Sequence, residues 1–562
     1  MQGAGAALLL LAACGLALSS SAAAAGQVES PPSADTPPQL PPDVLFQLLY
    51  AEPNNFLQSL GNISDTEGSL TRTFLSPAHR RAAGKLRRWM ASAGMRTWAD
   101  QMANVHGVVK GADPTAPAIF IGSHYDTVVD GGKYDGALGI VVGIAAVKAL
   151  LIEAAVAEGV VSLAEVERVV AHARTTGADI DVSELLYDQG QASQLFATPV
   201  RVIAFADEEG VRFHSTYLGS RALVGTLADV GVLRNIDHSG VSVAEALEQA
   251  GFDPSPAALR KMAIPRDKIK AYVEVHMEQG PRLQAAGRPL GPVAAIAGQS
   301  RLQAEIIGEQ GHAGTVPMKL RKDPMAAAAE IIAHMETMCN GGAHEGPPAS
   351  PSLAADESLV CTVGSMDVWP NAGNVIPGNL NFTLDIRSQW DANRKQVITS
   401  VEERMKTVCE RRGMSCRLIL KNTADAVHSD EGVVQSLMDA AVEAEPVVQR
   451  LFAQRPAFEH YPGSPTKTCA ASSDPDCKPP VLVSGAGHDA MVLAEVTKMG
   501  MLFVRCRDGI SHSPLEFVSP DDVAASTATL YQYLRKELLA KLPAAEAPAA
   551  EVPSPMNTEL QP

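Results

Sequence analysis

The chain has 562 residues, 46% of them hydrophobic, which is enough for two folded domains with tails and excludes wholesale disorder. Its formal net charge of -17 repels phosphate backbones, and no run of Lys and Arg offers a local exception. We therefore expect no nucleic-acid partner.

The N-terminal residues 1–26 have the pattern of a secretory signal peptide. An apolar block at 6–18 is followed by Ser and Ala residues that end in Ala-Ala-Ala-Ala-Gly. The block is short for a membrane span, and no later segment has about 18 uninterrupted apolar residues, so we expect no span in the mature chain. We expect the protein in the endoplasmic reticulum lumen or elsewhere in the secretory pathway.

The eight cysteines are too thinly spread for a disulfide scaffold. In an oxidising lumen, Cys469 and Cys477 could pair across a loop rich in Pro and Ser, and Cys409 and Cys416 are a second candidate pair. The sequon at Asn62 lies in a polar stretch, so we expect a glycoprotein.

After a Pro-rich linker, 27–44, short apolar runs alternate with helical patterns. The runs predicted as buried strands are 118–122, 200–205, 272–275, 481–483 and 501–504. Alternation of strands and helices predicts an α/β fold with a mostly parallel sheet that is covered by helices.

A different pattern begins at 297 and ends at 422. It predicts the order βαββαβ, with strands at 301–307, 359–368, 379–387 and 415–420 and helices at 323–338 and 391–411. Sheet strands resume near 481, so this unit is inserted into a larger domain made of 45–296 and 423–540. Residues 541–562 form a tail predicted to be disordered, and 153–196 and 446–480 are predicted to be additions to the core fold.

Polar residues gather where the predicted sheet strands stop. In chain order they are His124, Asp126, Asp135, Glu208, Glu209, His276 and His512. Because ligands bind at the carboxyl ends of strands in an open α/β sheet, we expect these side chains to converge. Each motif alone is commonly a solvated loop, a turn or a core histidine, but their recurrence at successive strand ends favours a site.

Three imidazoles and two carboxylates suit Zn, Mn or Co better than Mg, and they suffice for two ions if one carboxylate bridges. Two metal ions polarise a carbonyl oxygen and acidify a shared water, which then needs a base. A Glu beside the ligands that does not itself bind metal is the expected base.

The motifs that carry a family resemblance occur in order between about residue 45 and residue 539. They are GSHYDT (122–127), KYDG (133–136), FADEEGVRF (205–213), LGSR (218–221), VHMEQGP (275–281), GHAGTVPM (311–318), NVIPG (374–378), DIR (385–387), SGAGHDA (484–490) and ISHSP (510–514). The chain thereby resembles the dinuclear metal-dependent amidohydrolases of allantoate, ureidoglycolate and N-carbamoyl-L-amino acids, and within them most closely the plant-type allantoate branch.

The resemblance implies a metallopeptidase-like catalytic domain with an inserted ferredoxin-like lid and dimerisation domain. It also implies two divalent ions, most often Mn with Zn or Co as alternatives, bridged by Asp135. His124 and His276 would bind one ion, and Glu209 and His512 the other. Glu208 would be the general base, and Asp126 would orient His124.

The resemblance further assigns substrate contacts. Gln279, His312, Asn374 and Arg387 match substrate-binding positions, His312 also being a catalytic proton donor, and His488 either supports a ligand or touches the substrate. Arg387 suits a substrate carboxylate because its planar fork binds such groups in two places. The working unit would be a homodimer formed through the inserted domain, in which His312 serves the neighbouring site.

The activity implied is hydrolysis of a ureido C–N bond, in which allantoate and water give ureidoglycine, ammonia and carbon dioxide. Ureidoglycolate or an N-carbamoyl-L-amino acid is the alternative substrate on the same residues. An aminopeptidase or carboxypeptidase fits the motifs of the inserted unit less well. A catalytically inactive binding protein is disfavoured because every expected ligand and Glu208 are present.

Overall fold

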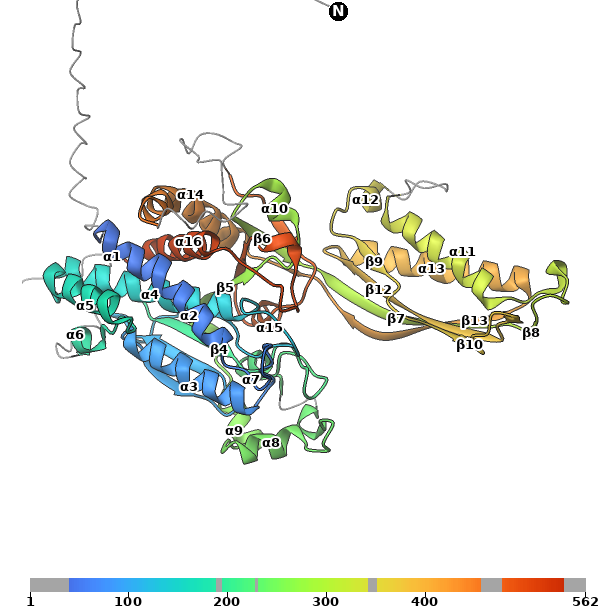
Figure 1. Ribbon diagram of the computed structural model, residues 1–562, viewed down its shortest axis with the longest axis horizontal. Coiled ribbons are helices and arrows are strands. Elements are labelled where there is room, and N and C mark those ends of the chain that lie inside the picture. Colours follow the sequence, from blue (N-terminus) through green and yellow to red (C-terminus); the bar gives the residue numbers. More distant parts are fainter. Residues whose placement is uncertain (1–39, 188–194, 228–230, 342–350, 456–477, 540–562) are drawn as a thin grey trace, which may run out of the picture. The chain divides into compact units, whose positions relative to one another are not determined.

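The computed structural model describes residues 40–187, 195–227, 231–341, 351–455 and 478–539 (Figure 1). The predicted signal peptide and tail, residues 27–39 of the predicted linker, and the candidate pair of Cys469 and Cys477 lie outside these residues. The first described helix begins at Pro42, so the last positions assigned to the linker are helical.

The larger sheet has nine strands in the order β1-β2-β4-β3-β5-β16-β6-β14, with β15 also paired to β6. These strands are β1 (Arg96–Ala99), β2 (Val105–Val109), β3 (Ala118–His124), β4 (Val200–Phe205), β5 (Ile269–Met277), β6 (Leu290–Ile296), β14 (Val427–His428), β15 (Leu482–Ser484) and β16 (Met499–Val504). The central strands β4, β3, β5 and β16 run parallel, and antiparallel strands flank them. The predicted α/β fold with its parallel core is confirmed.

Helices cover both faces of this sheet. They are α1 (Pro42–Phe46), α2 (Glu52–Gly61), α3 (Pro77–Ser92), α4 (Ala137–Ala157), α5 (Leu163–Thr176), α6 (Ser183–Tyr187), α7 (Leu218–Val224), α8 (Val243–Gln249), α9 (Pro256–Arg260), α10 (Arg282–Ala286), α14 (Glu431–Ala453), α15 (Asp489–Leu493) and α16 (Pro520–Leu538). Shorter turns of helix in the larger domain are η1 (Gln47–Ala51), η4 (Val232–Arg234), η5 (Arg266–Lys268) and η8 (Arg507–Gly509), and η6 (Met318–Leu320) lies in the inserted unit.

Alternation along the strands gives the sheet an apolar core on each face. On β3, Ile119 and Ile121 join the core that includes α4, α14 and α16, whereas Phe120 joins the opposite core with α15. Helix α4 packs on β3 and β5, and α16 packs on α4. The carboxyl ends of the parallel strands are thereby held rigidly between two layers of helices.

Helix α4 has apolar residues on every face, which suits its burial on every side. Its 21 residues include an 18-residue window with a mean hydropathy of 2.3, so its length and composition would allow a membrane span, but 89% of that window is buried in the fold. It is the one such helix among the described residues. Its charged side chains are matched inside the core: Lys148 lies 2.8 Å from Glu52, and Glu153 lies 3.0 Å from Arg535.

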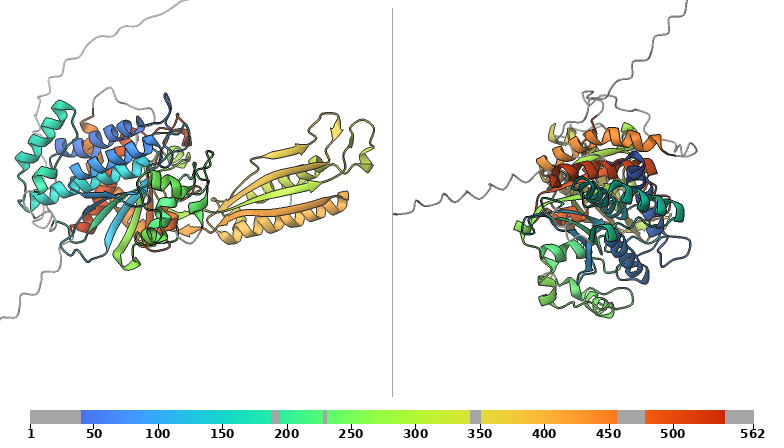
Figure 2. Two further views of the ribbon diagram at one scale, coloured as in Figure 1. Left: turned by 90° about the horizontal axis from the view of Figure 1, so that it is seen from below. Right: turned by 90° about the vertical axis from the view of Figure 1, so that its left-hand side faces the viewer.

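The inserted unit forms a second, antiparallel sheet in the order β10-β12-β7-β13, with β9 also paired to β12. Its elements are β7 (Gly298–Ile307), β8 (Gly311–His312), α11 (Pro324–Cys339), α12 (Pro351–Ala354), β9 (Val360–Thr362), β10 (Met366–Trp369), β11 (Val375–Ile376), β12 (Asn379–Ser388), α13 (Asp391–Arg412) and β13 (Ser415–Ala424). Helices α11 and α13 lie along one face of the sheet (Figures 1 and 2). The predicted ferredoxin-like order is confirmed, except that the second predicted strand is two short ones, β9 and β10.

Two disulfides fasten this inserted unit. Cys409 and Cys416 join the last turn of α13 to β13, as predicted, and Cys339 and Cys361 join the end of α11 to β9, which the sequence analysis missed. Cys506 is free and buried.

The two segments predicted as additions both begin inside core helices. Segment 153–196 starts within α4, and Val166 and Val170 of α5 are buried in the main core. Segment 446–480 starts within α14, which continues through Pro446. Both segments therefore begin in helices that pack in the larger domain, and that they are additions to the core fold stays a prediction.

Candidate metal centre

The predicted ligands come from the carboxyl ends of the parallel strands. His124 ends β3, Glu209 follows β4, and His276 lies near the end of β5. Asp135 precedes α4 by two residues, and His512 follows β16. Because β4, β3, β5 and β16 are neighbours, these side chains meet at one edge of the sheet.

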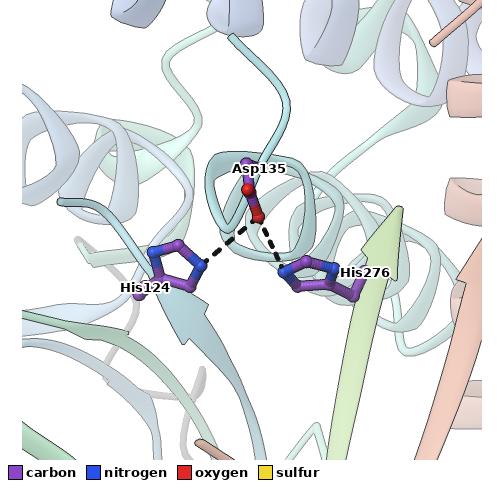
Figure 3. Close-up of side chains that lie close together, drawn as sticks. All are labelled: His124, Asp135 and His276. Carbon is purple, nitrogen blue, oxygen red and sulfur yellow. Dashed lines mark ion pairs between the residues drawn. The ribbon is translucent and has the colours of Figure 1, made fainter. Parts of the chain in front are cut away.

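Asp135 is the centre of the cluster (Figure 3). Its Oδ1 lies 3.1 Å from Nε2 of His276 and 3.6 Å from Nε2 of His124. Its Oδ2 lies 3.2 Å from Nε2 of His512, which in turn lies 3.3 Å from Oε1 of Glu209. One carboxylate therefore faces two separate sets of donors, one through each oxygen.

Two groups of possible ligands share Asp135. The first contains His124 and His276, and the second Glu209 and His512; within each group the ligand atoms lie within 4.8 Å of one another. This is the division expected from the sequence, and it suits a dinuclear site in which a carboxylate bridges two ions.

His276 shows that the donors fit metal ions. Its Nδ1 lies 2.9 Å from the carbonyl oxygen of Met277, so Nδ1 carries the proton that it donates there. Its Nε2 is buried and makes no hydrogen bond, although Asp135 is 3.1 Å away. A nitrogen lone pair that faces a carboxylate needs a cation between them, which is the arrangement of a metal-binding imidazole.

The charges of the centre depend on one another. Burial would raise the pKa of Asp135, but His124, His276 and His512 hold it well below its ordinary value. Asp135 and Glu209 raise the pKa of His512 to about 10. Divalent cations would supply the positive charge that these carboxylates need.

Asp126 holds the turn after β4. Its carboxylate accepts hydrogen bonds from the backbone N–H groups of Glu208 (3.1 Å) and Glu209 (3.2 Å). The carbonyl oxygen of Asp126 lies 3.2 Å from Nδ1 of His124, closer than its carboxylate at 3.5 Å. Asp126 therefore fixes both the histidine and the two glutamates.

Glu208 is 8% exposed at the edge of the centre. It forms a further group of neighbouring donors with His124 and Glu209. Burial raises the pKa of Glu208 well above its ordinary value, and Glu209 adds to the rise. A carboxylate with a raised pKa beside a metal site can accept a proton near neutral pH.

His488 lies behind His276 rather than beside the opening of the site. Its ring centroid is 4.5 Å from that of His276, its Nε2 is 2.8 Å from the hydroxyl of Ser484, and its side chain is buried. Of the two roles expected for His488, this position supports the ligand-supporting one.

The four predicted substrate-contacting residues do not all lie at the cluster around Asp135. Gln279 is there: its side-chain amide donates to Asp135 Oδ2 and to the hydroxyl of Ser511, both at 3.0 Å. Arg387 donates twice to Asp385 at 2.9 Å and once to the carbonyl of Gly485 at 2.7 Å. Its guanidinium is thus already held by protein groups.

His312 and Asn374 lie together at the other end of the inserted sheet. His312 of β8 pairs with Val375 of β11, and both His312 and Asn374 are exposed. Arg387 pairs with Gln299 at the start of β7, whereas β8 follows the end of β7. A ten-residue strand spans about 30 Å, so these contacts are separated by that length along the insert.

Comparison with known proteins places the chain in a family. Residues 184–536 match peptidase family M20/M25/M40. The chain belongs to this family. This chain is 41% identical over 489 residues to the allantoate deiminase of Arabidopsis thaliana. The match covers 86% of this chain and 81% of the relative.

The chain is also similar to a second relative and to a solved structure. It is 34% identical over 483 residues to the N-carbamoyl-L-amino-acid amidohydrolase of Pseudomonas sp. (strain NS671), covering 86% of this chain and 97% of the relative. It resembles the crystal structure of a hydantoinase/carbamoylase family amidase from Burkholderia ambifaria, at 26% identity and a TM-score of 0.65 over 87% of this chain and 98% of that one. The family expected from the motifs is confirmed, and the chain is a hydrolase of it.

Ser511 and Glu516 were not predicted from the sequence as residues of the site. Glu516 accepts hydrogen bonds from the backbone N–H groups of Tyr134 (2.8 Å) and Asp135 (3.0 Å), and Ser511 lies 3.1 Å from Asp135 and 3.3 Å from Glu516. Together they tie the loop of Asp135 to the loop of His512. The available signal was an acid four residues beyond His512, two residues past the ISHSP motif.

A carboxylate beneath the centre was not predicted from the sequence either. Glu274 of β5 is fully buried and accepts hydrogen bonds from the side chains of Ser123 (3.1 Å) and Tyr272 (3.0 Å) and from the backbone of Ala490 (2.9 Å). It forms another donor group with His276 and His488. A single acid inside an apolar strand pattern gave no motif by which to recognise it.

Proposed function

We propose that the protein is an allantoate amidohydrolase, which converts allantoate and water to ureidoglycine, ammonia and carbon dioxide. The observation that carries the proposal is the carboxylate of Asp135 between two donor groups, in a chain 41% identical to an allantoate deiminase. Such a centre suits hydrolysis of a ureido carbonyl, a poor electrophile that needs strong polarisation.

The centre would hold two divalent ions, Mn first and Zn or Co as alternatives, and these would supply a polarised carbonyl and an acidified water. Asp135 would contribute to both sets of ligands, with His124 and His276 in one set and Glu209 and His512 in the other. Glu208 takes the proton of the attacking water and passes it to the leaving nitrogen. Asp126 keeps Glu208 beside the ligands through its backbone N–H group.

Arg387 would bind the substrate carboxylate. Asp385 holds the guanidinium by two hydrogen bonds, so its planar fork is fixed before the substrate arrives. The remaining contact, to the carbonyl of Gly485, is the one that a substrate carboxylate would replace. Gln279, which reaches Asp135, would contact the ureido group next to the metals.

The working unit would be a homodimer formed through the inserted domain. His312 and Asn374 are exposed and lie about 30 Å along the insert from Arg387. A partner chain could bring the two into a site, where His312 would donate a proton to the developing oxyanion. Pairing of β10 or β13, the outer strands of the insert's sheet, with a second copy would also cover an open edge.

The protein would work in the secretory pathway, in the endoplasmic reticulum lumen or beyond. Two disulfides in the insert support an oxidising compartment. Asn62 is exposed at the end of α2, which supports a glycan there. Both features agree with the signal peptide expected at 1–26.

An N-carbamoyl-L-amino-acid hydrolase is the second candidate function, because a relative with that activity in its name is 34% identical over most of its length. Ureidoglycolate is a third candidate substrate. All three substrates share a ureido group and a carboxylate, so the residues around these groups would serve each of them.

The test is release of ammonia from allantoate, ureidoglycolate and an N-carbamoyl-L-amino acid, measured side by side on protein loaded with Mn, Zn or Co. We expect the highest kcat/KM with allantoate, and loss of activity after treatment with a chelator. A higher kcat/KM with the N-carbamoyl-L-amino acid would replace the proposal by the second candidate. Activity that survives complete metal removal would refute the dinuclear mechanism.

A further inference from the structure

A second cavity lies at the opposite ends of the strands that carry the metal centre. It has a volume of about 910 Å³ and is lined at the start of β3 by Ala118 and at the start of β4 by Arg201. His124 is at the far end of β3, a seven-residue strand that spans about 20 Å. The two sites are therefore separate.

The lining of this cavity is basic, although the whole chain has a net charge of -17. The basic residues are Arg96, Lys110, Arg201, Lys261 and Lys268, and the acidic ones are Asp100 and Asp253. Asp100 is already engaged, since it accepts hydrogen bonds from His106, from the side chain of Asn104 and from two backbone N–H groups. The cavity keeps an excess of positive charge.

Arg201 is the most unusual of these residues. Its guanidinium lies 4.8 Å from the ring centroid of Phe120 and 5.5 Å from that of Trp98. Its Nε is buried without a hydrogen-bond partner, and among the described residues no carboxylate pairs with it. Burial and the nearby Arg96 lower the pKa of Arg201 to about 10. An arginine held in this way lacks the acceptors that a buried guanidinium needs.

Its neighbours have no carboxylate partners either. Within the part of the chain that the structure describes, no ion pair engages Arg96, Lys110 or Lys261. Arg96 lies over the Trp98 ring at 5.1 Å, and Trp98 stacks on His106 at 4.9 Å. The aromatic rings thus hold two guanidinium groups at the cavity, and Lys110 and Lys261 also line it.

We propose that this cavity is a second binding site, for a small organic anion of the phosphate or polycarboxylate class. Arg201 would be its main anchor, and Arg96, Lys110 and Lys261 would surround the charged groups. A volume of about 910 Å³ is at the scale of metabolite pockets, which are about 300–1,000 Å³. It is much larger than an inorganic ion requires, which is why the ligand is assigned as organic.

The probes are inorganic phosphate, adenosine monophosphate and tricarballylate, titrated by calorimetry into the metal-loaded full chain at low ionic strength. We expect at least one of the two organic anions to bind. Arg201→Gln and Lys261→Gln should each weaken that binding about tenfold or more, because each removes a charged donor. Arg260→Gln is the matched control, because Arg260 is exposed on the same helix as the cavity's Ala258 but does not line the cavity.

A thermal unfolding series gives an independent readout. The organic anion should raise the Tm of the wild type and of Arg260→Gln, because a ligand stabilises the state that binds it. It should raise the Tm of the two cavity variants less. If Arg201→Gln does not fold, the exposed Lys261→Gln still decides the matter.

Three outcomes would overturn the proposal. The first is that neither organic anion binds, and the second is that inorganic phosphate alone binds, which would mark an adventitious ion. The third is that binding is unchanged in both cavity variants, which would place the anion elsewhere, including at the metal centre.

Discussion

The neighbours Glu208 and Glu209 have the same side chain but different surroundings. Glu209 reaches His512 at 3.3 Å and shares a donor group with Asp135, whereas Glu208 neighbours only the His124 side of the centre. A metal ligand and a base can therefore be adjacent in the sequence, because successive side chains after a strand point different ways. The assignment of the two roles can be tested by removing one charge at a time.

We predict that Glu208→Gln keeps both metal ions and lowers turnover at least about a hundredfold, the usual scale for a general base. Glu209→Gln should instead lose metal, because it removes a charged ligand. Metal content per chain, measured by mass spectrometry, and initial rates of ammonia release distinguish the two. Equal metal loss in both variants would contradict the assignment.

A second residue-scale prediction concerns acid stability. His79 is fully buried, its Nε2 lies 2.7 Å from the carbonyl of Ala206, and burial lowers its pKa from the ordinary 6.5 to about 4. The folded state keeps His79 neutral, so its contribution to stability is complete above pH 6.5 and is lost as the pH falls toward 4. Between pH 7.5 and pH 5 the loss is about 2 kcal/mol.

The measurement is Tm at these two pH values, on metal-free protein so that loss of metal does not contribute. His79→Gln keeps a donor for Ala206 but cannot titrate, so its Tm should fall less than that of the wild type on acidification. An identical fall in both proteins would show that His79 is not the group responsible.

At the scale of elements, the insert depends on its disulfides more than the larger domain does. Cys339 and Cys361 close a loop of 22 residues, and Cys409 and Cys416 close one of 7. Because a cross-link restricts the unfolded chain more when its loop is longer, replacing the first pair by Ser should cost about 3 kcal/mol and replacing the second about 2 kcal/mol.

Hydrogen exchange would show which double variant loses more stability and in which part of the molecule. Amides of α11 and α13 should exchange faster in either double variant, and those of β3 and β5 should be unchanged. Faster exchange in β3 would mean that the insert and the larger domain unfold together.

At the scale of the whole molecule, the proposed homodimer makes a prediction about mixtures. His312→Ala and Glu208→Gln each remove a different component, and in a mixed dimer one site would keep both. Mixing the two inactive variants under conditions of subunit exchange should restore about a quarter of wild-type activity, if exchange is random and sites are independent. Each variant incubated alone is the control.

Exchange is confirmed by the mass of a tagged subunit. If mixed dimers form but ammonia release does not recover, then His312 acts within its own chain or has no part in the reaction. The position of His312, about 30 Å along the insert from Arg387, would then have to change by movement of the insert itself.

The sequence predicted the cluster around Asp135 better than the rest, because side chains at the carboxyl ends of parallel strands converge. His124, Glu209 and His276 each follow or end an apolar run, so the rule for parallel sheets brought them together correctly. Glu274 and Glu516 were missed because their roles depend on partners far along the chain, such as Ser123 and Tyr134. Local pattern carries no information about such partners.

The same limit of local pattern explains why the second disulfide and the burial of α5 were not predicted. The bond between Cys339 and Cys361 depends on how α11 and β9 pack, and that is a property of the folded insert. Likewise, α5 has an ordinary amphipathic composition, and only its burial shows that it belongs to the core. Fold class and the order of helices and strands along the chain could be predicted because they follow from periodicity.

Helix α4 has a further consequence for how such a chain is made. Its most apolar 18-residue window, with a mean hydropathy of 2.3, would compete for release into lipid while a secretory chain, as proposed, is threaded through a translocon. Lys148, near the middle of the helix, opposes that release, because a charge there costs about 2.5–3.5 kcal/mol, and Glu153 adds a second charge nearer the end. After folding, Glu52 and Arg535 neutralise them, so an apolar core helix can cross the membrane without stopping in it.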